Sequence, residues 1–317
     1  MSNPEHLVSA TALTTRPLRF GADGPDPVDL ETVVALVQAT DLAAIGELDS
    51  GASDVAGLVA MPTMDRAATF LAFDGDIAVG FAFIEDDATA RDTFIDLYAP
   101  PGPWRRTVHE VALARGMEAA HRHRVAAPGS RTVRSGAWTT DTDLIADLEA
   151  HDLVPVRRFH RMRIDSGSPS IPSTMPALPP GVEIVVSDDE ATRRRICDVD
   201  NETFLDHWHF TPRPFDEWWS MWESSPARDP LGWWLLTVDG VDSAICLLDE
   251  SRADIGDGYV AVLGVRRSRP ATWARSCSQP VAPGLLVSRT FRRSPRHQAS
   301  SSACPCTERT ADIPTPS

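Results

Sequence analysis

The chain has 317 residues, of which 42% are hydrophobic, 24% charged and 7% aromatic, with a formal net charge of −15 and a sequence pI of about 5.0. The length suits two domains of ordinary size, and the composition excludes a fibrous or largely disordered protein. The acidic charge argues against nucleic acid or a membrane surface as partner. The longest apolar runs, such as 77–84, are too short to span a bilayer, and residues 1–20 lack the apolar core of a secretory signal, so we expect a cytoplasmic protein.

Cysteine usage predicts neither a disulfide framework nor a zinc site. The five cysteines form no Cys-x-x-Cys pair and no spacing with histidine that is typical of zinc ligands. We therefore expect reduced thiols and no bound metal. The chain contains no lysine, so arginine supplies all of its strongly basic side chains.

The first half of the chain predicts an α/β unit. Apolar residues at helical spacing predict a helix over 30–44, with Asp29 as its N-cap. An Asp-Gly turn at 74–76, between the apolar runs 67–73 and 77–84, predicts a β-hairpin. The other expected elements are strands at 93–98, 132–138 and 156–164 and helices at 104–126 and 144–150.

A similar order of elements begins again after a Ser/Pro-rich stretch at 166–181, which is typical of a solvated linker. We interpret residues 17–165 and 182–269 as tandem copies of one α/β unit. Six of the nine tryptophans lie between Trp208 and Trp234, and we favour core packing for them over a ligand pocket. The elements expected in the second copy are strands at 182–186 and 259–265, a helix at 190–204, a Trp-rich segment at 208–222 and a hairpin that turns at Asp239-Gly240.

The repeat stops after Arg269. Residues 270–317 show no helical or strand periodicity, are rich in Ser and Pro, and carry a net positive charge that contrasts with the acidic remainder. An arginine cluster that includes Arg292 and Arg293 has no nucleic-acid-binding motif around it. We therefore expect a disordered tail.

Two segments of the second copy resemble a known family. Gly258-Tyr-Val-Ala-Val-Leu-Gly-Val-Arg-Arg-Ser-Arg269, which follows the hairpin, resembles the strand that enters the acetyl-CoA loop in the GNAT superfamily of N-acetyltransferases. Residues 201–218 are similar to the acceptor-side helices of tandem GNAT proteins of the mycothiol synthase type. The resemblance implies an α/β (α+β) fold of two tandem mixed-sheet domains, the second truncated. It also implies acetyl transfer from acetyl-CoA, as co-substrate, to an amine of a small molecule.

The resemblance also implies where the site lies. In this family, CoA pyrophosphate binds a helix N-terminus, and the preceding strand offers backbone donors to pantetheine and to the reacting carbonyl. The acceptor-side segment supplies Glu202 and His207 as the catalytic candidates, with Asp206 and His209 as further candidates for the base. No tyrosine follows Tyr259, so no general acid is assigned. The implied acetyl-CoA contacts are Val262, Leu263, Gly264, Val265, Arg266 and Arg267.

Neither copy contains the intact loop Gln/Arg-x-x-Gly-x-Gly/Ala. In the first copy, the Pro-rich residues 99–106 stand in its place, and proline offers no N–H donor, so we interpret this copy as a structural pseudo-repeat. In the second copy, the codon of Trp273 is TGG and that of Ala274 begins with G, so reading one base later gives a glycine. Suitable codons then turn residues 270–276 into Arg-Arg-Arg-Gly-Leu-Gly.

We hypothesise a frameshift near Arg269. It predicts weak or absent acetyl-CoA binding and poor stability of the second domain. The alternative function is a non-catalytic GNAT-fold module that binds or regulates a partner.

Overall fold

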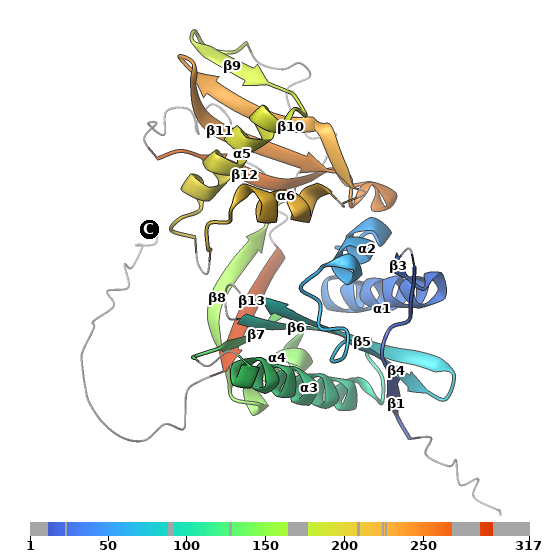
Figure 1. The fold of residues 1–317 in the computed structure, drawn as a ribbon. Helices are drawn as coiled ribbons and strands as arrows, with labels where there is room; N and C mark the ends of the chain where they lie inside the picture. The colour runs from blue at the N-terminus through green and yellow to red at the C-terminus, as the bar shows by residue number, and fades with distance from the viewer. Residues whose placement is uncertain are drawn as a thin grey trace, which may run out of the picture.

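A computed structural model describes residues 12–22, 24–87, 92–126, 129–163, 177–207, 210–223, 225 and 227–267, together with the backbone of residues 286–293. Two sheets organise this part of the chain (Figure 1). The larger has seven strands in the order β1-β4-β5-β6-β7-β13-β8, and the smaller has four in the order β12-β11-β10-β9. A two-stranded ribbon pairs β2 (Phe20–Gly21) with β3 (Gly24–Pro25). No helix within the described ranges combines the length and the apolar character that a membrane span requires.

The larger sheet is antiparallel except for one parallel pair, β6 with β7. The predicted Asp-Gly turn joins β4 to β5, so the predicted hairpin is confirmed. The strands of this sheet are β1 (Thr14–Arg16), β4 (Phe70–Asp74), β5 (Ile77–Asp87), β6 (Asp92–Tyr98), β7 (Thr132–Trp138), β8 (Leu153–Arg161) and β13 (Leu286–Arg293).

Helices cover both faces of the larger sheet, and each face has its own core. Helices α1 (Pro27–Ile45) and α2 (Ala52–Ala60) pack on one face, where Val33, Phe81 and Phe83 are buried together (Figure 1). Helices α3 (Arg105–Ala126) and α4 (Thr142–Ala150) pack on the other face, against Phe70 and Ile95. The sheet is therefore held between two helical layers, as an α/β architecture requires.

The start of α1 differs from the prediction. Asp26, and not Asp29, is the N-cap, and its carboxylate accepts the backbone N–H groups of Val28 and Asp29. Asp29 is fully buried and pairs with Arg16 at 2.7 Å and with Arg19 at 2.6 Å. The two guanidinium groups hold the pKa of Asp29 well below its usual range. The sequence pattern could not reveal this pairing, because it depends on the chain folding back from β1.

Along the chain, the elements of the second copy follow the order that the sequence predicts. Its strands are β9 (Val182–Val185), β10 (Arg228–Val238), β11 (Val241–Asp249) and β12 (Tyr259–Val265). Helices α5 (Glu190–Thr203) and α6 (Phe215–Glu223) cover one face, and a short 3₁₀ turn, η1 (Ala253–Ile255), precedes β12. Trp218 and Trp233 are buried in this core with ring centroids 5.8 Å apart, so core packing is confirmed for these two tryptophans.

The tail contributes one strand, which corrects the expectation of a wholly irregular segment 270–317. Strand β13 lies between β7 and β8 and pairs antiparallel with both, so it fills a place in the sheet of the first copy (Figure 1). Backbone pairing between two open strand edges requires no side-chain periodicity, which explains why the sequence pattern missed it. Residues 166–176, most of the predicted linker at 166–181, lie outside the described residues.

Candidate functional site

The residues predicted for a site in the second copy lie on β12 and on the segment that follows α5 or at their ends. Arg266 Nε lies 3.0 Å from a carboxylate oxygen of Glu202, and Arg266 also donates to the backbone carbonyl of Asp242. Gly264 lies under α5 so closely that an added Cβ would stand 2.6 Å from Thr203 Oγ1. Glu202 is therefore near the predicted acetyl-CoA strand, but its carboxylate is already engaged by a guanidinium group.

The other predicted residues of this site are divided between core and surface. Val262 packs against the aromatic core, whereas the side chains of Leu263 and Val265 are exposed. Arg267 pairs with Asp206. The ring of exposed His207 stands 5.8 Å from the Phe204 ring and 6.3 Å from the ring of Phe159 in β8. His209 lies outside the described residues.

A second candidate site lies in the first copy, where β6 and β7 separate. Their parallel pairing runs from Asp92↔Thr132 to Ile95↔Ser135. Beyond Ile95 and Ser135, no further residues of the described backbone pair between the two strands. Strand β6 continues beside β5 as far as Tyr98, and β7 continues beside β13 as far as Trp138. Two neighbouring strands therefore part in the middle of the sheet, and the chain leaves β6 toward the N-terminus of α3.

The loop between β6 and α3 has few backbone donors. Pro100, Pro101 and Pro103 carry no N–H group, so only part of the loop could contact an anion. The helix that follows is 22 residues long, and its first turn presents backbone N–H groups and the positive end of the helix dipole. Arg106 lies in this turn and its side chain is 75% exposed.

Two polar side chains mark the point where β6 and β7 part. Tyr98 Oη donates a hydrogen bond of 2.7 Å to Asp96 Oδ2, because alternate residues of a strand share a face. The Tyr98 ring also stacks on Phe81, with centroids 5.8 Å apart. Burial raises the pKa of the Asp96 carboxyl, and burial together with the nearby Asp96 carboxylate raises that of the Tyr98 hydroxyl. Asp96 is therefore a carboxylate that takes up a proton more readily than an exposed one.

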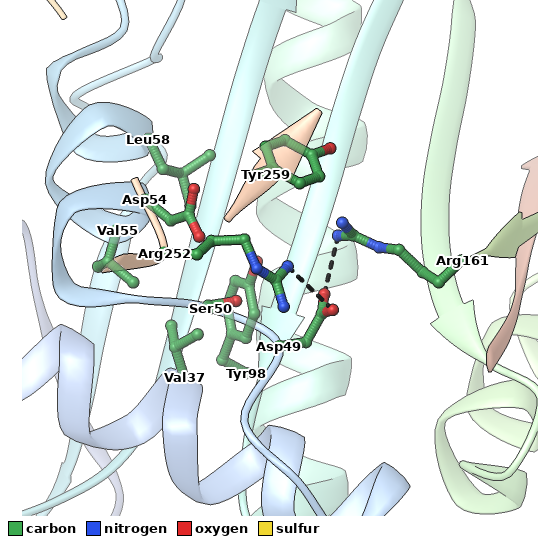
Figure 2. Close-up of a pocket in the computed structure, with 10 residues that line it drawn as sticks. All are labelled: Val37, Asp49, Ser50, Asp54, Val55, Leu58, Tyr98, Arg161, Arg252 and Tyr259. Atoms are coloured by element: carbon green, nitrogen blue, oxygen red, sulfur yellow. Dashed lines mark hydrogen bonds and ion pairs between the residues drawn. The ribbon is translucent and has the colours of Figure 1, made fainter. Parts of the chain in front are cut away.

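A cavity of about 190 Å³ adjoins Tyr98 at the junction of the two copies (Figure 2). The loop between α1 and α2 provides Asp49, and the segments flanking η1 provide Arg252 and Tyr259. Asp49 Oδ1 lies 3.1 Å from Arg252, and Asp49 Oδ2 lies 2.8 Å from Arg161 at the end of β8. One carboxylate thus joins guanidinium groups from both halves of the chain.

Asp41 of α1 holds the loop that carries Asp49. Its Oδ2 accepts the backbone N–H groups of Asp49 at 3.1 Å and Ser50 at 3.0 Å. Burial raises the pKa of the Asp41 carboxyl to about 6. Sequence reasoning missed Asp41, Asp49, Asp96 and Tyr98 as site residues, because none belongs to a motif. The only available signal was the position of Asp96 and Tyr98 at the end of a predicted strand.

A scan of protein-family models gives no match, and a search of curated proteins gives none either. Solved structures do match. A GCN5-related N-acetyltransferase from Sphaerobacter thermophilus is 21% identical with a TM-score of 0.67, over 88% of this chain and 95% of that one. A tandem GNAT protein from the clavulanic acid biosynthesis pathway is 13% identical with a TM-score of 0.62, over 90% of this chain and all of that one.

A third match is a GCN5-related glucosamine N-acetyltransferase region in a fungal multi-domain GH3 β-N-acetylglucosaminidase. It is 12% identical with a TM-score of 0.54, over 90% of this chain and 38% of that one. At these identities, the similarity shows a shared fold. The chain therefore has the tandem GNAT fold that the residues of its second half led us to expect.

Proposed function

We propose that this protein transfers an acetyl group from acetyl-CoA to an amine of a small molecule, and that the first copy holds the reacting groups in this chain. The observation that carries the proposal is the parting of β6 and β7 beside the N-terminus of α3. The opening exposes strand backbone to a thioester, and the helix terminus suits the pyrophosphate. The tandem GNAT fold supports the same chemistry.

The reaction needs a group that accepts a proton. An acceptor ammonium group must lose a proton before its nitrogen attacks the thioester carbonyl carbon. A C–N bond then forms, the C–S bond breaks, and the second proton that the attacking nitrogen loses balances the proton that the CoA thiolate takes to leave as a thiol. Asp96 is placed to receive the first proton, and Tyr98, which already donates to Asp96, is placed to assist.

The proton-transfer step is tested with Asp96→Asn. We expect kcat to fall by about 100-fold, as for loss of a general base, with acetyl-CoA binding unchanged. The assay follows amine-dependent release of CoA thiol. Since the chain has no lysine, acetylation of lysine side chains of the protein itself adds no background to this assay.

Glu202→Gln is the contrasting variant, because Glu202 with His207 is the predicted catalytic pair of the second copy. Activity lost in Glu202→Gln and retained in Asp96→Asn would move the reaction to β12 and to the predicted contacts from Val262 to Arg267. In that case, Arg267→Glu should also weaken acetyl-CoA binding.

The second candidate function is a GNAT-fold module without turnover. The three prolines of the loop before α3 favour it, because they remove backbone donors from the place where pyrophosphate would bind. They also lead us to expect acetyl-CoA binding weaker than the micromolar range. Saturable binding with no amine-dependent thiol release would favour the module.

We further propose that the acetyl-CoA loop of the second copy was lost by a frameshift near Arg269. Resequencing the DNA across codons 260–317 tests this. A one-base shift that restores Arg-x-x-Gly-x-Gly followed by helix and strand patterns supports it, and an intact frame excludes a sequencing error.

A further inference from the structure

The cavity between the two copies has walls of opposite charge from different parts of the chain. Asp49 and Asp54 come from the first copy, Arg161 comes from the end of β8, and Arg252 comes from the second copy (Figure 2). Two carboxylates and two guanidinium groups leave the lining electrically balanced. A balanced lining favours a ligand that itself carries one charge of each sign over an anion or a cation.

The guanidinium end of the cavity can receive a carboxylate. Arg161 and Arg252 both point at Asp49, and the Tyr259 ring lies 5.8 Å from one guanidinium carbon and 5.5 Å from the other. Arg252 is also held by Asp257, at 3.3 Å. The Arg161 side chain is 42% exposed, and among the described residues it forms an ion pair with Asp49 alone. The N–H donors of Arg161 that do not face Asp49 therefore remain available to a second carboxylate.

The opposite end can receive an ammonium group. Asp54 accepts one backbone N–H, that of Gly51 at 3.2 Å, and Tyr98 lines the same cavity. Three apolar residues, Val37, Val55 and Leu58, line the cavity on the Asp54 side, away from Arg161 (Figure 2). Such a wall accommodates methylene groups.

The geometry points to a small zwitterion, an amino-acid-like molecule with a carboxylate and an amine separated by a few methylene groups, as the ligand of this cavity. Its carboxylate binds Arg161, and its ammonium group binds the Asp54 carboxylate. This inference rests on the proposed function in one respect, since the amine end lies toward Tyr98 and would be the acetyl acceptor. Arg161 is then a residue that determines specificity.

The test measures binding without acetyl-CoA, so that it is independent of catalysis. The probes are 5-aminopentanoate, pentanoate and pentylammonium, titrated into the full chain and followed by NMR. We expect 5-aminopentanoate to bind at least about tenfold more tightly than either probe that lacks one charged end. Equal affinity for all three probes, or binding of none, would overturn the inference.

Arg161→Gln identifies the residue. We expect this variant to lose about tenfold in affinity for 5-aminopentanoate and pentanoate and to bind pentylammonium as before. Arg158→Gln, at an exposed position of the same strand, is the matched control and should change none of the three. Arg161→Lys keeps the charge and loses the fork, so an intermediate affinity is expected from a folded protein.

The two proposals can fail separately. Zwitterion binding that depends on Arg161, without acetyl transfer from acetyl-CoA to any amine tested, would leave the cavity assignment intact and contradict the proposed function. Acetylation of amines at rates that Arg161→Gln does not change, together with equal binding of the three probes, would do the reverse.

Discussion

Asp41 is a buried carboxyl group that holds the loop carrying Asp49 in the candidate site. Its pKa is about 6 because burial penalises the carboxylate, whereas an unfolded aspartate titrates near 3.9. The protonated form therefore fits the folded state better. Stability from this group is fully present below about pH 4 and is lost as the pH rises through about 6.

Asp41→Asn should remove this pH dependence. We expect the variant to gain stability relative to the parent chain between pH 4 and pH 7, by about 1–2 kcal/mol, because asparagine keeps an acceptor for the N–H groups of Asp49 and Ser50. Urea unfolding at several pH values measures the difference. Glu31→Gln, at an exposed position of the same helix, is the control. A constant difference between Asp41→Asn and the parent chain across this range would contradict the assignment.

Residue patterns alone could not locate such groups. The i, i+3 pattern predicted α1 correctly, but it assigned the cap to Asp29, whose partners Arg16 and Arg19 come from outside the helix. Similarly, Glu202 and His207 were chosen by resemblance. In the structure, Glu202 forms an ion pair with Arg266, and the His207 ring contacts the Phe204 ring. Long-range pairs of this kind leave no local signal.

At the scale of elements, α5 packs on β12 through a glycine. Gly264→Ala would place a Cβ 2.6 Å from Thr203 Oγ1, so the Thr203 side chain, or the end of α5 that carries it, must shift. We expect a loss of about 1–3 kcal/mol in the free energy of unfolding of the second sheet. Gly258→Ala is the control, since a Cβ there meets nothing within 4 Å. Equal unfolding midpoints for the two variants in guanidinium chloride would show that this contact is not tight.

The pairing of β13 with β7 and β8 predicts that the tail stabilises the larger sheet. A chain shortened to residues 1–267 should lose hydrogen-exchange protection in β7 and β8, because β13 supplies backbone partners to both. A chain shortened to residues 1–293 should retain it. Identical exchange in both chains would mean that the tail does not complete this sheet.

The sequence best predicted the elements that are determined by residues close together in the chain. The Asp-Gly turn gave the β4–β5 hairpin, and the long periodic segment gave α3 almost to the residue. Helix α2 was missed, since Val55 and Val59 are its only fully buried side chains and form too short a pattern. Strand β13 was missed because its pairing lies in the backbone.

At the scale of the molecule, the tandem arrangement was visible from the order of elements, but the relation between the copies was not. Arg252 with Asp49, Arg163 with Asp257 and Arg213 with Asp87 join residues of the first part of the chain to residues of the second. The first pair lines the cavity (Figure 2), and the second lies within a few residues of the lining residues Arg161 and Tyr259. Our proposal that the first copy holds the reaction, in place of the expectation that it is only a structural repeat, rests separately on the parting of β6 and β7.

Charge at the N-terminus of α3 provides a first check of that proposal. Arg106→Glu places a negative charge where the pyrophosphate would lie, so acetyl-CoA should bind about tenfold more weakly. Arg124→Glu, at the exposed far end of the same helix, is the matched control and should bind as the parent chain does. Binding is followed by NMR titration. Equal weakening in both variants would indicate a general effect of net charge.

The most direct measurement is hydrogen exchange of the full chain with and without saturating acetyl-CoA, resolved by peptide. Our account predicts slower exchange in residues 96–107, where β6 leaves β7 and α3 begins, with little change in β12. Slower exchange confined to residues 259–267 would return the site to the second copy, and no change in either segment would contradict acetyl-CoA binding altogether.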